Sequence, residues 1–230
     1  MRPLIVESAT VIRAVFWDFG GVILSSPFAA FNAYERANGI PVDHIRRVNS
    51  TDPDTNAWAR IERRELSHAE FDEAFAAESE ALGHRIPGRD VIGMLYGTIR
   101  PEMVDALDRV VAAGYITACL TNNVSIDAHR DDVAAVMARF HHVVESSRAG
   151  VRKPEPAFYE LACAVAEVEP VEVVFLDDLG INLKPARAMG MTTIKVLEAD
   201  QAITDLEAVL GITVRDPSTD AHPNRRAAVP

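Results

Sequence analysis

The stretch Ala14-Val15-Phe16-Trp17-Asp18-Phe19-Gly20-Gly21-Val22-Ile23-Leu24 decides the fold. Its first four residues form a short apolar run, which is typical of a strand buried on both faces of a parallel sheet. A carboxylate ends the run, and the two glycines that follow allow the backbone to turn sharply. Asp18 is therefore predicted at the carboxyl end of a strand, where open α/β sheets bind their ligands. An Asp that only caps a turn would give the same local pattern.

Beyond about residue 98, apolar runs alternate regularly with helical patterns, as they do in a parallel α/β sheet. Further strands are predicted over 115–120, 142–144, 173–176 and 192–197. Helices are predicted over 101–113, 156–167 and 203–210, with another that ends near Ala138. The sequence thus predicts an α/β fold with a Rossmann-like parallel sheet core.

No strand-like run is found between Leu24 and about Thr98. The segment instead shows helical patterns over 28–38, from a capping Asp43 to Val48, and after a capping box formed by Ser67 and Glu70. Because a parallel sheet normally returns to its next strand after one helix, this segment is predicted to be an inserted helical cap. The predicted division is a core of residues 1–24 and 98–215, a cap of residues 25–97, and a flexible tail of residues 216–230.

Composition and charge exclude several classes of partner. The chain has 230 residues, of which 48% are hydrophobic, and its formal net charge is -11. Such a surface repels phosphate backbones, so neither nucleic acid nor an anionic membrane is an expected partner. The first twelve residues are too interrupted by charges for a signal peptide, and no run is long enough to cross a membrane. Cys119 and Cys163 lie in apolar runs without metal-ligand spacing and are predicted to be buried free thiols, so we expect a cytoplasmic location.

Polar residues follow the ends of several predicted strands or lie in the adjacent loops. They are Asp18, the pair Thr121-Asn122, Lys153 and the pair Asp177-Asp178. In a parallel sheet these positions meet at one edge, so the side chains are expected to converge. Carboxylates are the ligands that Mg²⁺ prefers, while a lysine and a hydroxyl with neighbouring amides suit a phosphoryl group. Asp18 can also act as a nucleophile.

Four motifs in this order resemble those of the haloacid-dehalogenase (HAD) superfamily of hydrolases. The subfamily is the one with a helical cap after the first strand, and the chain is most similar to the phosphatase domain at the amino end of soluble epoxide hydrolase and its relatives. The resemblance covers roughly residues 12–210. The motifs are Phe16-Trp17-Asp18-Phe19-Gly20-Gly21-Val22, Leu120-Thr121-Asn122, Gly150-Val151-Arg152-Lys153-Pro154-Glu155-Pro156 and Val174-Phe175-Leu176-Asp177-Asp178-Leu179-Gly180-Ile181-Asn182-Leu183-Lys184-Pro185-Ala186-Arg187. The cap phrase Trp58-Ala59-Arg60-Ile61-Glu62-Arg63-Arg64-Glu65-Leu66 also resembles this group.

The resemblance implies a catalytic role for residues of the first three motifs. Asp18 matches the nucleophile that forms an aspartyl-phosphate. Thr121 and Asn122 match the hydroxyl and amide that hold the transferred phosphoryl oxygens. Lys153 matches the lysine that balances the charge of nucleophile and phosphate.

The resemblance also implies a Mg²⁺ site. The expected ligands are Asp18, the Gly20 carbonyl and Asp178, with Asp177 either a neighbouring ligand or a group that supports the ligands. In the cap, Trp58 is expected in the apolar core, although its position would also let it line the substrate pocket. Trp58 and Glu62 are the candidate substrate contacts.

Gly20 is a departure from the pattern, since phosphatases of this family usually carry a second Asp there. The backbone carbonyl of that Asp binds the metal, which glycine can also supply. Its side chain protonates the leaving group, which glycine cannot do. General acid–base help is typically worth about 10²–10⁴-fold in rate, so its loss is expected to raise the barrier by about 3–5 kcal/mol. Turnover is therefore expected to be slow, or selective for good leaving groups such as anomeric or acyl phosphates.

The sequence predicts a Mg²⁺-dependent phosphomonoester hydrolase that acts on a small phosphorylated molecule. Two alternatives stay open. A metal-free 2-haloacid dehalogenase would use Asp18 to attack carbon, and the dehalogenases of this superfamily also lack the second Asp because a halide leaves without protonation. Against it, the Asp177-Asp178 pair would repel a substrate carboxylate if no cation were present. A non-catalytic member that binds a phosphorylated ligand or a protein is the second alternative, although a binder needs no nucleophile.

Overall fold

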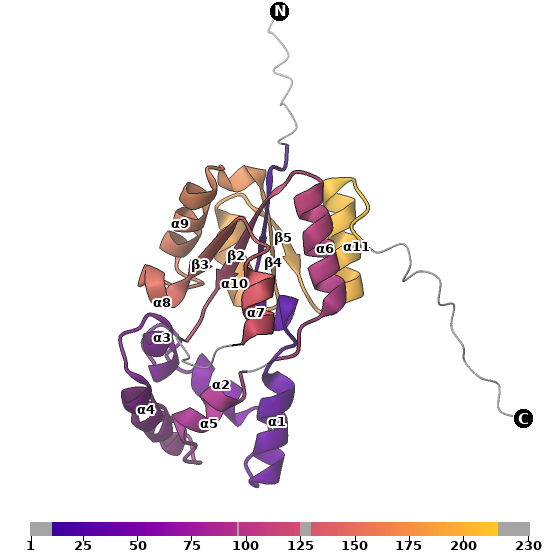
Figure 1. Cartoon of the computed structure of the whole chain (residues 1–230). Helices are drawn as coiled ribbons and strands as arrows, with labels where there is room; N and C mark the ends of the chain where they lie inside the picture. The colour runs from indigo at the N-terminus through magenta and orange to yellow at the C-terminus, as the bar shows by residue number, and fades with distance from the viewer. Residues whose placement is uncertain (1–10, 96, 125–129, 216–230) are drawn as a thin grey trace, which may run out of the picture.

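A computed structural model describes residues 11–95, 97–124 and 130–215 (Figure 1). Within these residues five parallel strands form one sheet in the order β3-β2-β1-β4-β5. The strands are β1 (Ala14–Trp17), β2 (Ile116–Thr121), β3 (His142–Glu145), β4 (Val173–Asp177) and β5 (Thr192–Lys195). The predicted parallel α/β core is confirmed, and β1 lies at its centre between β2 and β4.

The central strand is buried on both faces, which explains its continuous apolar run. Ala14 and Phe16 belong to one hydrophobic cluster, while Val15 and Trp17 belong to the cluster on the opposite face. All four residues are fully buried. The sheet is therefore the middle layer of three, as its parallel order requires.

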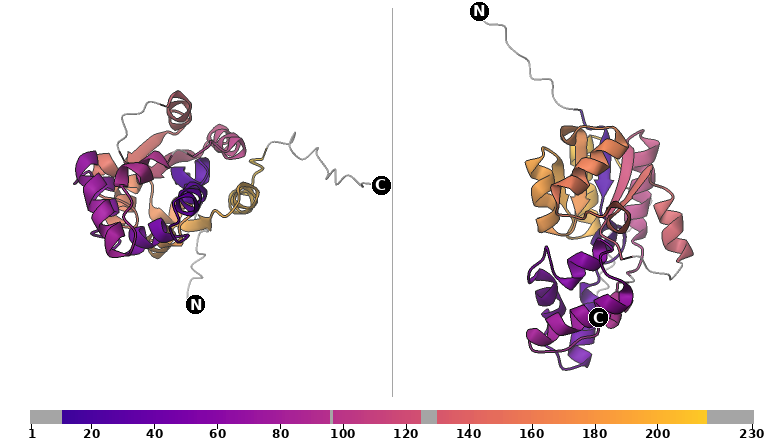
Figure 2. Two further views of the ribbon diagram at one scale, coloured as in Figure 1. Left: turned by 90° about the horizontal axis from the view of Figure 1, so that it is seen from below. Right: turned by 90° about the vertical axis from the view of Figure 1, so that its left-hand side faces the viewer.

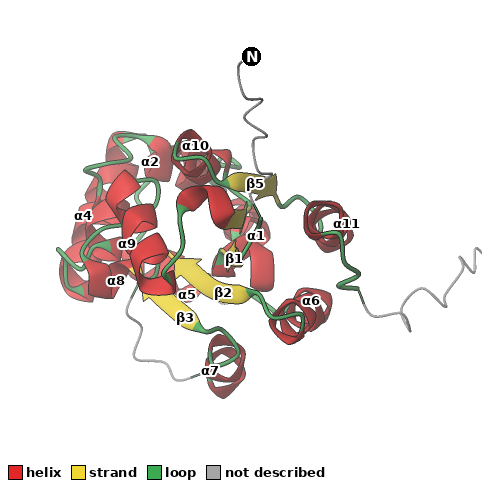
Figure 3. Ribbon diagram, turned by 90° about the horizontal axis from the view of Figure 1, so that it is seen from above, coloured by secondary structure: helices red, strands yellow, loops and turns green. Residues whose placement is uncertain are grey.

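Helices cover both faces of the sheet (Figure 3). One face packs against α6 (Pro101–Ala112), α7 (Asp131–Met137) and α11 (Ala199–Leu210). The other packs against α9 (Pro156–Ala166) and α10 (Gly180–Ala188). Two short elements, α8 (Ser146–Ala149) and the 3₁₀ turn η2 (Pro170–Glu172), connect strands and helices. Helix α11 begins four residues before the predicted start at Ile203.

The described helices between residues 28 and 93 lie together beyond the carboxyl edge of the sheet (Figures 1 and 2). They are α1 (Phe28–Ala37), α2 (His44–Ser50), α3 (Ala57–Glu62), α4 (His68–Ala81) and α5 (Gly88–Gly93). Their apolar side chains form a hydrophobic cluster of their own, which Val124 joins from the loop after β2. We propose that residues 25–97 form the cap predicted from the sequence, and we use that name for them below.

The two chain segments that join the cap to the core run side by side. Leu24 and Ile99 form an isolated antiparallel bridge. On either side of it, the Ser25 N–H donates to the Thr98 carbonyl at 2.8 Å, and the Arg100 N–H donates to the Ile23 carbonyl at 2.9 Å. The cap therefore leaves and re-enters the core at one place.

The start of α2 differs from the prediction. Asp43 has a φ of 67°, and its side chain makes no capping hydrogen bond within the described part of the chain. The N–H groups of Asp43 and Ile45 donate instead to the buried Glu35 carboxylate, at 2.7 and 2.8 Å. Glu35, a residue of α1, thus caps the start of α2. The sequence around Asp43 alone does not reveal a contact of this kind. The capping box of Ser67 and Glu70 is confirmed.

Two predictions concern residues outside this description. Residues 216–230, for which the sequence predicts a flexible tail, lie outside the described residues. So do residues 1–10, which make up most of the segment whose charges argue against a signal peptide. Among the described residues, no helix combines the length and the apolar character that a membrane crossing requires.

Candidate active site

Asp18 lies directly after β1, at the sheet edge that faces the cap. It precedes a short turn, η1 (Phe19–Ile23), and its Oδ1 accepts a hydrogen bond from the Phe19 N–H at 2.6 Å. Its own N–H donates to the Leu176 carbonyl at 2.8 Å, which continues the pairing with β4. Burial raises the pKa of Asp18 well above its ordinary value, and Lys153 opposes that shift.

Lys153 holds two of the carboxylates together. Its side chain is 1% exposed, and its Nζ lies 2.8 Å from Asp18 Oδ1 and 2.8 Å from Asp177 Oδ2. Burial alone would lower the pKa of Lys153, but the charges of Asp177 and Asp18 raise it above its ordinary value. The lysine is therefore charged and placed to balance the nucleophile candidate.

The two adjacent aspartates after Leu176 have different surroundings. Asp177 is fully buried, and its oxygens accept hydrogen bonds from the Leu179 N–H, from Lys153 Nζ and from the Asn182 amide, at 2.8–3.1 Å. Asp178 lies against Gly21 instead. Burial, followed by the charge of Asp177, raises the pKa of Asp178 to about 6. Asp177 thus positions Lys153, and Asp178 is the better candidate for a metal ligand.

The donor set fits a hard divalent cation. One carboxylate oxygen from each of Asp18, Asp177 and Asp178 lies within 4.8 Å of the other two. The pKa values of Asp18 and Asp178 are raised because burial and neighbouring carboxylates disfavour their charge. A cation such as Mg²⁺, which prefers carboxylate oxygens, would offset that repulsion. Arg100 supplies further positive charge and donates from Nη1 to the Gly21 carbonyl at 3.1 Å.

The two glycines after Asp18 have opposite steric roles. Gly21 has a φ of 76°, and a Cβ there would lie 2.2 Å from Asp178 Oδ2. Gly20 has ordinary dihedral angles, φ -70° and ψ 132°. Apart from Gly20 and its two chain neighbours, no described residue has a heavy atom within 4 Å of the position that a Cβ at residue 20 would take. Glycine is therefore required at 21, whereas position 20 has room for a side chain.

Thr121 is the last residue of β2, the neighbour of β1, and Asn122 follows it. Thr121 is buried, and its contact with a phosphoryl group stays a prediction. The Asn122 side chain is hydrogen-bonded to the peptide of Lys153: its Nδ2 donates to the Lys153 carbonyl at 2.8 Å, and its Oδ1 accepts from the Lys153 N–H at 2.9 Å. Asn122 thus fixes the loop that carries the lysine, and its contact with a phosphoryl group stays a prediction.

The cap reaches this site through Glu62, at the end of α3. Glu62 Oε1 accepts from the Trp58 indole N–H at 2.8 Å. Its Oε2 accepts from Arg152 Nε at 2.5 Å and from Asn122 Nδ2 at 3.2 Å. Burial raises the pKa of Glu62, and Arg152 opposes this shift. Both Glu62 oxygens therefore already accept hydrogen bonds from protein donors. Contacts of Glu62 and Trp58 with a substrate stay predictions.

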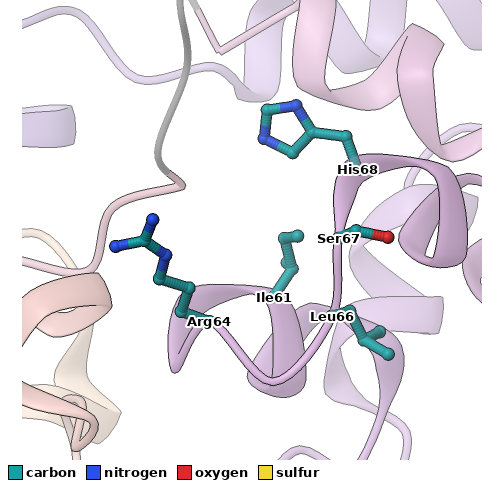
Figure 4. Close-up of a pocket in the computed structure, with 5 residues that line it drawn as sticks. All are labelled: Ile61, Arg64, Leu66, Ser67 and His68. Atoms are coloured by element: carbon teal, nitrogen blue, oxygen red, sulfur yellow. The ribbon is translucent and has the colours of Figure 1, made fainter.

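A separate hollow of about 160 Å³ lies in the cap, at the connection between α3 and α4 (Figure 4). Its lining residues are Ile61, Arg64, Leu66, Ser67 and His68. None of the candidate residues named from the sequence lines it, so it is distinct from the carboxylate cluster.

The structure thus brings together Asp18, Lys153, Asp177 and Asp178. Asn122 is hydrogen-bonded to the Lys153 peptide, and Glu62 accepts a hydrogen bond from Asn122. Sequence reasoning missed Arg100 and Arg152. Arg152 stands directly before Lys153 in a motif, which is a signal that could have pointed to it, whereas Arg100 carries no such signal.

Three relatives show how far the likeness extends. The chain is 32% identical to mouse acyl-CoA dehydrogenase family member 10, over 95% of this chain and 21% of that protein. It is 32% identical to mouse bifunctional epoxide hydrolase 2, over 87% of this chain and 39% of that protein. It thus spans well under half the length of these two relatives. It is also 23% identical to the sesquiterpene phosphatase astK of Aspergillus oryzae, over 88% of this chain and 98% of that protein.

Two solved structures share the fold. A HAD family enzyme from Bacteroides thetaiotaomicron, solved in complex with magnesium and inorganic phosphate, has a TM-score of 0.56 and 21% identity over 80% of this chain and 93% of its own. An L-2-haloacid dehalogenase from Xanthobacter autotrophicus, solved with chloropropionic acid covalently bound, has a TM-score of 0.56 and 22% identity over 96% of this chain and 93% of its own. Residues 12–190 match the family described as haloacid dehalogenase-like hydrolase. The chain is therefore a member of the haloacid dehalogenase-like hydrolases.

Proposed function

We propose that this hydrolase is a Mg²⁺-dependent phosphatase that acts on small phosphate monoesters through an aspartyl-phosphate on Asp18. The observation that carries the proposal is that the three carboxylates make different contacts. Lys153 is bound by Asp18 and Asp177, while Asp178 lies beside them with a raised pKa. When ionised, the three carboxylates and Lys153 carry a net negative charge, so the cluster suits a divalent cation and accepts a phosphoryl group only with that cation bound.

In the proposed mechanism Asp18 attacks first. Its Oδ1 accepts from the Phe19 N–H and from Lys153, so Oδ2 is the attacking oxygen. The new bond joins Oδ2 to phosphorus, the ester P–O bond breaks, and the leaving oxygen takes up a proton from solvent. A water molecule then attacks phosphorus, the Oδ2–P bond breaks, and a proton of that water passes to solvent. Inorganic phosphate and the Asp18 carboxylate are released.

The other residues bind and orient the phosphoryl group. Lys153 and the Thr121 hydroxyl would stabilise charge on its oxygens. Asp177 supports this role of Lys153, because its Oδ2 accepts a hydrogen bond from Lys153 Nζ. Asp18, Asp178 and the Gly20 carbonyl would hold Mg²⁺, which when bound screens the carboxylates from the phosphate charge. Because position 20 carries no proton donor, the favoured substrates are those with good leaving groups, such as acyl or anomeric phosphates.

A haloacid dehalogenase is the second candidate, and Gly20 is the observation that favours it, since a halide leaves without a proton. The carboxylate cluster argues against it. Asp177 and Asp178 next to Asp18 would repel the carboxylate of a haloacid unless a cation were bound.

The free and buried state of both cysteines supports a reducing compartment, and we extend the proposal to a cytoplasmic location on that ground.

Phosphate release from a substrate panel tests the proposed function. The panel contains an acyl phosphate, an anomeric sugar phosphate, p-nitrophenyl phosphate and an alkyl phosphate, each with Mg²⁺ and after exhaustive chelation. We expect Mg²⁺-dependent phosphate release, fastest for the acyl and anomeric phosphates. Chloride release from 2-chloropropionate by chelated enzyme, without phosphate release from any ester, would show that the dehalogenase alternative is correct.

Substituting each of the two glycines tests the proposed metal site. In Gly21→Ala the new methyl group displaces the Asp178 carboxylate, and we expect Mg²⁺ affinity to fall by about 10–100-fold, as is typical when a group that orients a metal ligand is disturbed. Gly20→Ala is expected to keep wild-type affinity, because nothing described lies near its Cβ. Titration calorimetry with Mg²⁺ measures both.

A third glycine provides the control for strain. Gly211, at the end of α11, also has positive φ (69°) but open space around its Cβ. Gly211→Ala therefore carries only the conformational cost of a left-handed alanine, about 1–2 kcal/mol. It is expected to lower the melting temperature without changing Mg²⁺ affinity. If Gly21→Ala behaved in the same way, Asp178 would not be a metal ligand.

A further inference from the structure

Glu62 belongs to the cap, yet its carboxylate is buried against two residues of the core. Its side chain is 6% exposed, and that of its partner Arg152 is 12% exposed. Arg152 also donates from Nη1 to the carbonyl of Pro53, a second cap residue, at 3.1 Å. A buried pair of this kind depends on both partners, because removal of one leaves the other charge without compensation.

Both core partners of Glu62 are connected to Lys153. Arg152 precedes Lys153 in the chain, and Asn122 forms two hydrogen bonds with the Lys153 peptide. Asn122 Nδ2 donates to the Glu62 carboxylate and to the Lys153 carbonyl together. The lysine side chain then continues to Asp18 at 2.8 Å. A continuous set of contacts therefore runs from α3 of the cap to the nucleophile candidate.

We propose that Glu62 is a positioning residue that makes the placement of Lys153 depend on the seating of α3 against the core. When α3 is seated, its carboxylate is the acceptor that Arg152 and Asn122 need, and the Lys153 peptide is held from both sides. When α3 moves away, both donors lose this acceptor, and the loop that carries Lys153 is less restrained. The expected effect on kcat rests on the proposed function, whereas the restraint of the loop that carries Lys153 does not.

A second ion pair across the same interface provides a comparison. Arg63, the neighbour of Glu62, lies 3.1 Å from Glu155, with side-chain exposures of 14% and 35%. Its contacts do not include Asn122 or the Lys153 peptide, and Arg63 has other acceptors in Glu65 and the Asp54 carbonyl. Solvent screens this pair more than it screens Glu62 and Arg152, because the Glu155 side chain is 35% exposed. Glu155→Gln is therefore a control that weakens a contact between cap and core but leaves the acceptor of Arg152 and Asn122 in place.

Hydrogen exchange tests the structural part of the proposal directly. The Lys153 N–H donates to Asn122 Oδ1, so its exchange rate reports on the restraint. Residues 154 and 156 are prolines, so few other amides in this peptide interfere. We expect faster exchange at Lys153 in Glu62→Gln and wild-type exchange in Glu155→Gln. Glu62→Asp keeps the charge but shortens the side chain, so it gives an intermediate rate and serves if Glu62→Gln does not fold.

Kinetics with p-nitrophenyl phosphate and Mg²⁺ test the functional part. A misplaced Lys153 is expected to lower kcat by about 10–100-fold, since a displacement of about 1 Å can cost about 10²-fold, with a smaller rise in KM because Lys153 also binds the phosphoryl group. The loss of a direct contact between Glu62 and the substrate would instead raise KM at constant kcat. Because Glu62 and Arg152 act together, the double variant Glu62→Gln/Arg152→Gln is expected to lose little more than Glu62→Gln alone.

Each outcome decides the proposal. Wild-type exchange at Lys153 in folded Glu62→Gln or Glu62→Asp would overturn it, as would a change in KM alone. A lower melting temperature with unchanged kcat would show a merely structural role. If the wild-type protein released phosphate from no ester, the proposed function would fail, and the exchange experiment would still decide the role of Glu62.

Discussion

Asp18→Asn is expected to abolish phosphate release. The amide keeps the shape of the side chain but lacks the negative oxygen that attacks phosphorus. Removing the nucleophile of a covalent mechanism costs up to about 10⁶-fold in serine hydrolases, and we expect a loss of more than about 10³-fold here. Beryllofluoride, a mimic of the aspartyl-phosphate, is expected to bind the wild-type protein with Mg²⁺ but not the variant. Phosphate release over long incubations measures the loss of activity, and titration calorimetry measures the binding of beryllofluoride.

Loss of activity through unfolding must be separated from loss of the nucleophile. Asp18→Asn gives up the ion pair with Lys153 but also removes repulsion from Asp177 and Asp178, so the fold is expected to persist. Circular dichroism and the melting temperature check this. Asp105→Asn, on the exposed face of α6, is the matched control and is expected to keep full activity. Turnover near the wild-type rate in Asp18→Asn would mean that another group is the nucleophile.

Gly20→Asp is expected to accelerate hydrolysis of esters with poor leaving groups. A general acid is worth about 10²–10⁴-fold, and the gain is expected to be largest for alkyl phosphates and small for p-nitrophenyl phosphate, whose phenolate leaves readily. The backbone at Gly20 is compatible with an ordinary side chain, and nothing described lies within 4 Å of its Cβ. The measurement is the ratio of variant to wild-type kcat/KM across leaving groups of increasing pKa.

Gly20→Asn is the matched control, because it has the same size and no acidic proton. It is expected to show no gain for any leaving group. A ratio that stays flat across the series for folded Gly20→Asp would show that another residue already supplies the proton. A dehalogenase would gain nothing from the change.

The core of the fold could be predicted because its strands are short and buried on both faces. Runs such as Ala14–Trp17 and Val173–Leu176 have an apolar character that local sequence displays directly. Once the strands are parallel, topology alone brings their carboxyl ends to one edge. The cluster of Asp18, Lys153 and Asp178 therefore followed from sequence order without any knowledge of tertiary contacts.

Roles that depend on side-chain direction could not be predicted in the same way. Asp177 and Asp178 are adjacent and chemically identical, and their surroundings separate their roles: Asp177 contacts Lys153 and Asn182, whereas Asp178 lies against Gly21. Glu35, which caps α2, and Glu62, which binds Arg152, act across elements that are distant in sequence. Such contacts are set by how helices pack, and the periodicity of a helix does not specify which distant residue it meets.

The paired linkers around Leu24 and Ile99 give this enzyme a modular construction. Since the cap leaves and re-enters the core at one place, its length can change without any change in the order of the strands in the sheet. Under the proposed function, recognition of new compounds can evolve in the cap while the groups that we assign to catalysis stay in the core. Glu62 limits that freedom, because a transplanted insertion must bring its own acceptor for Arg152.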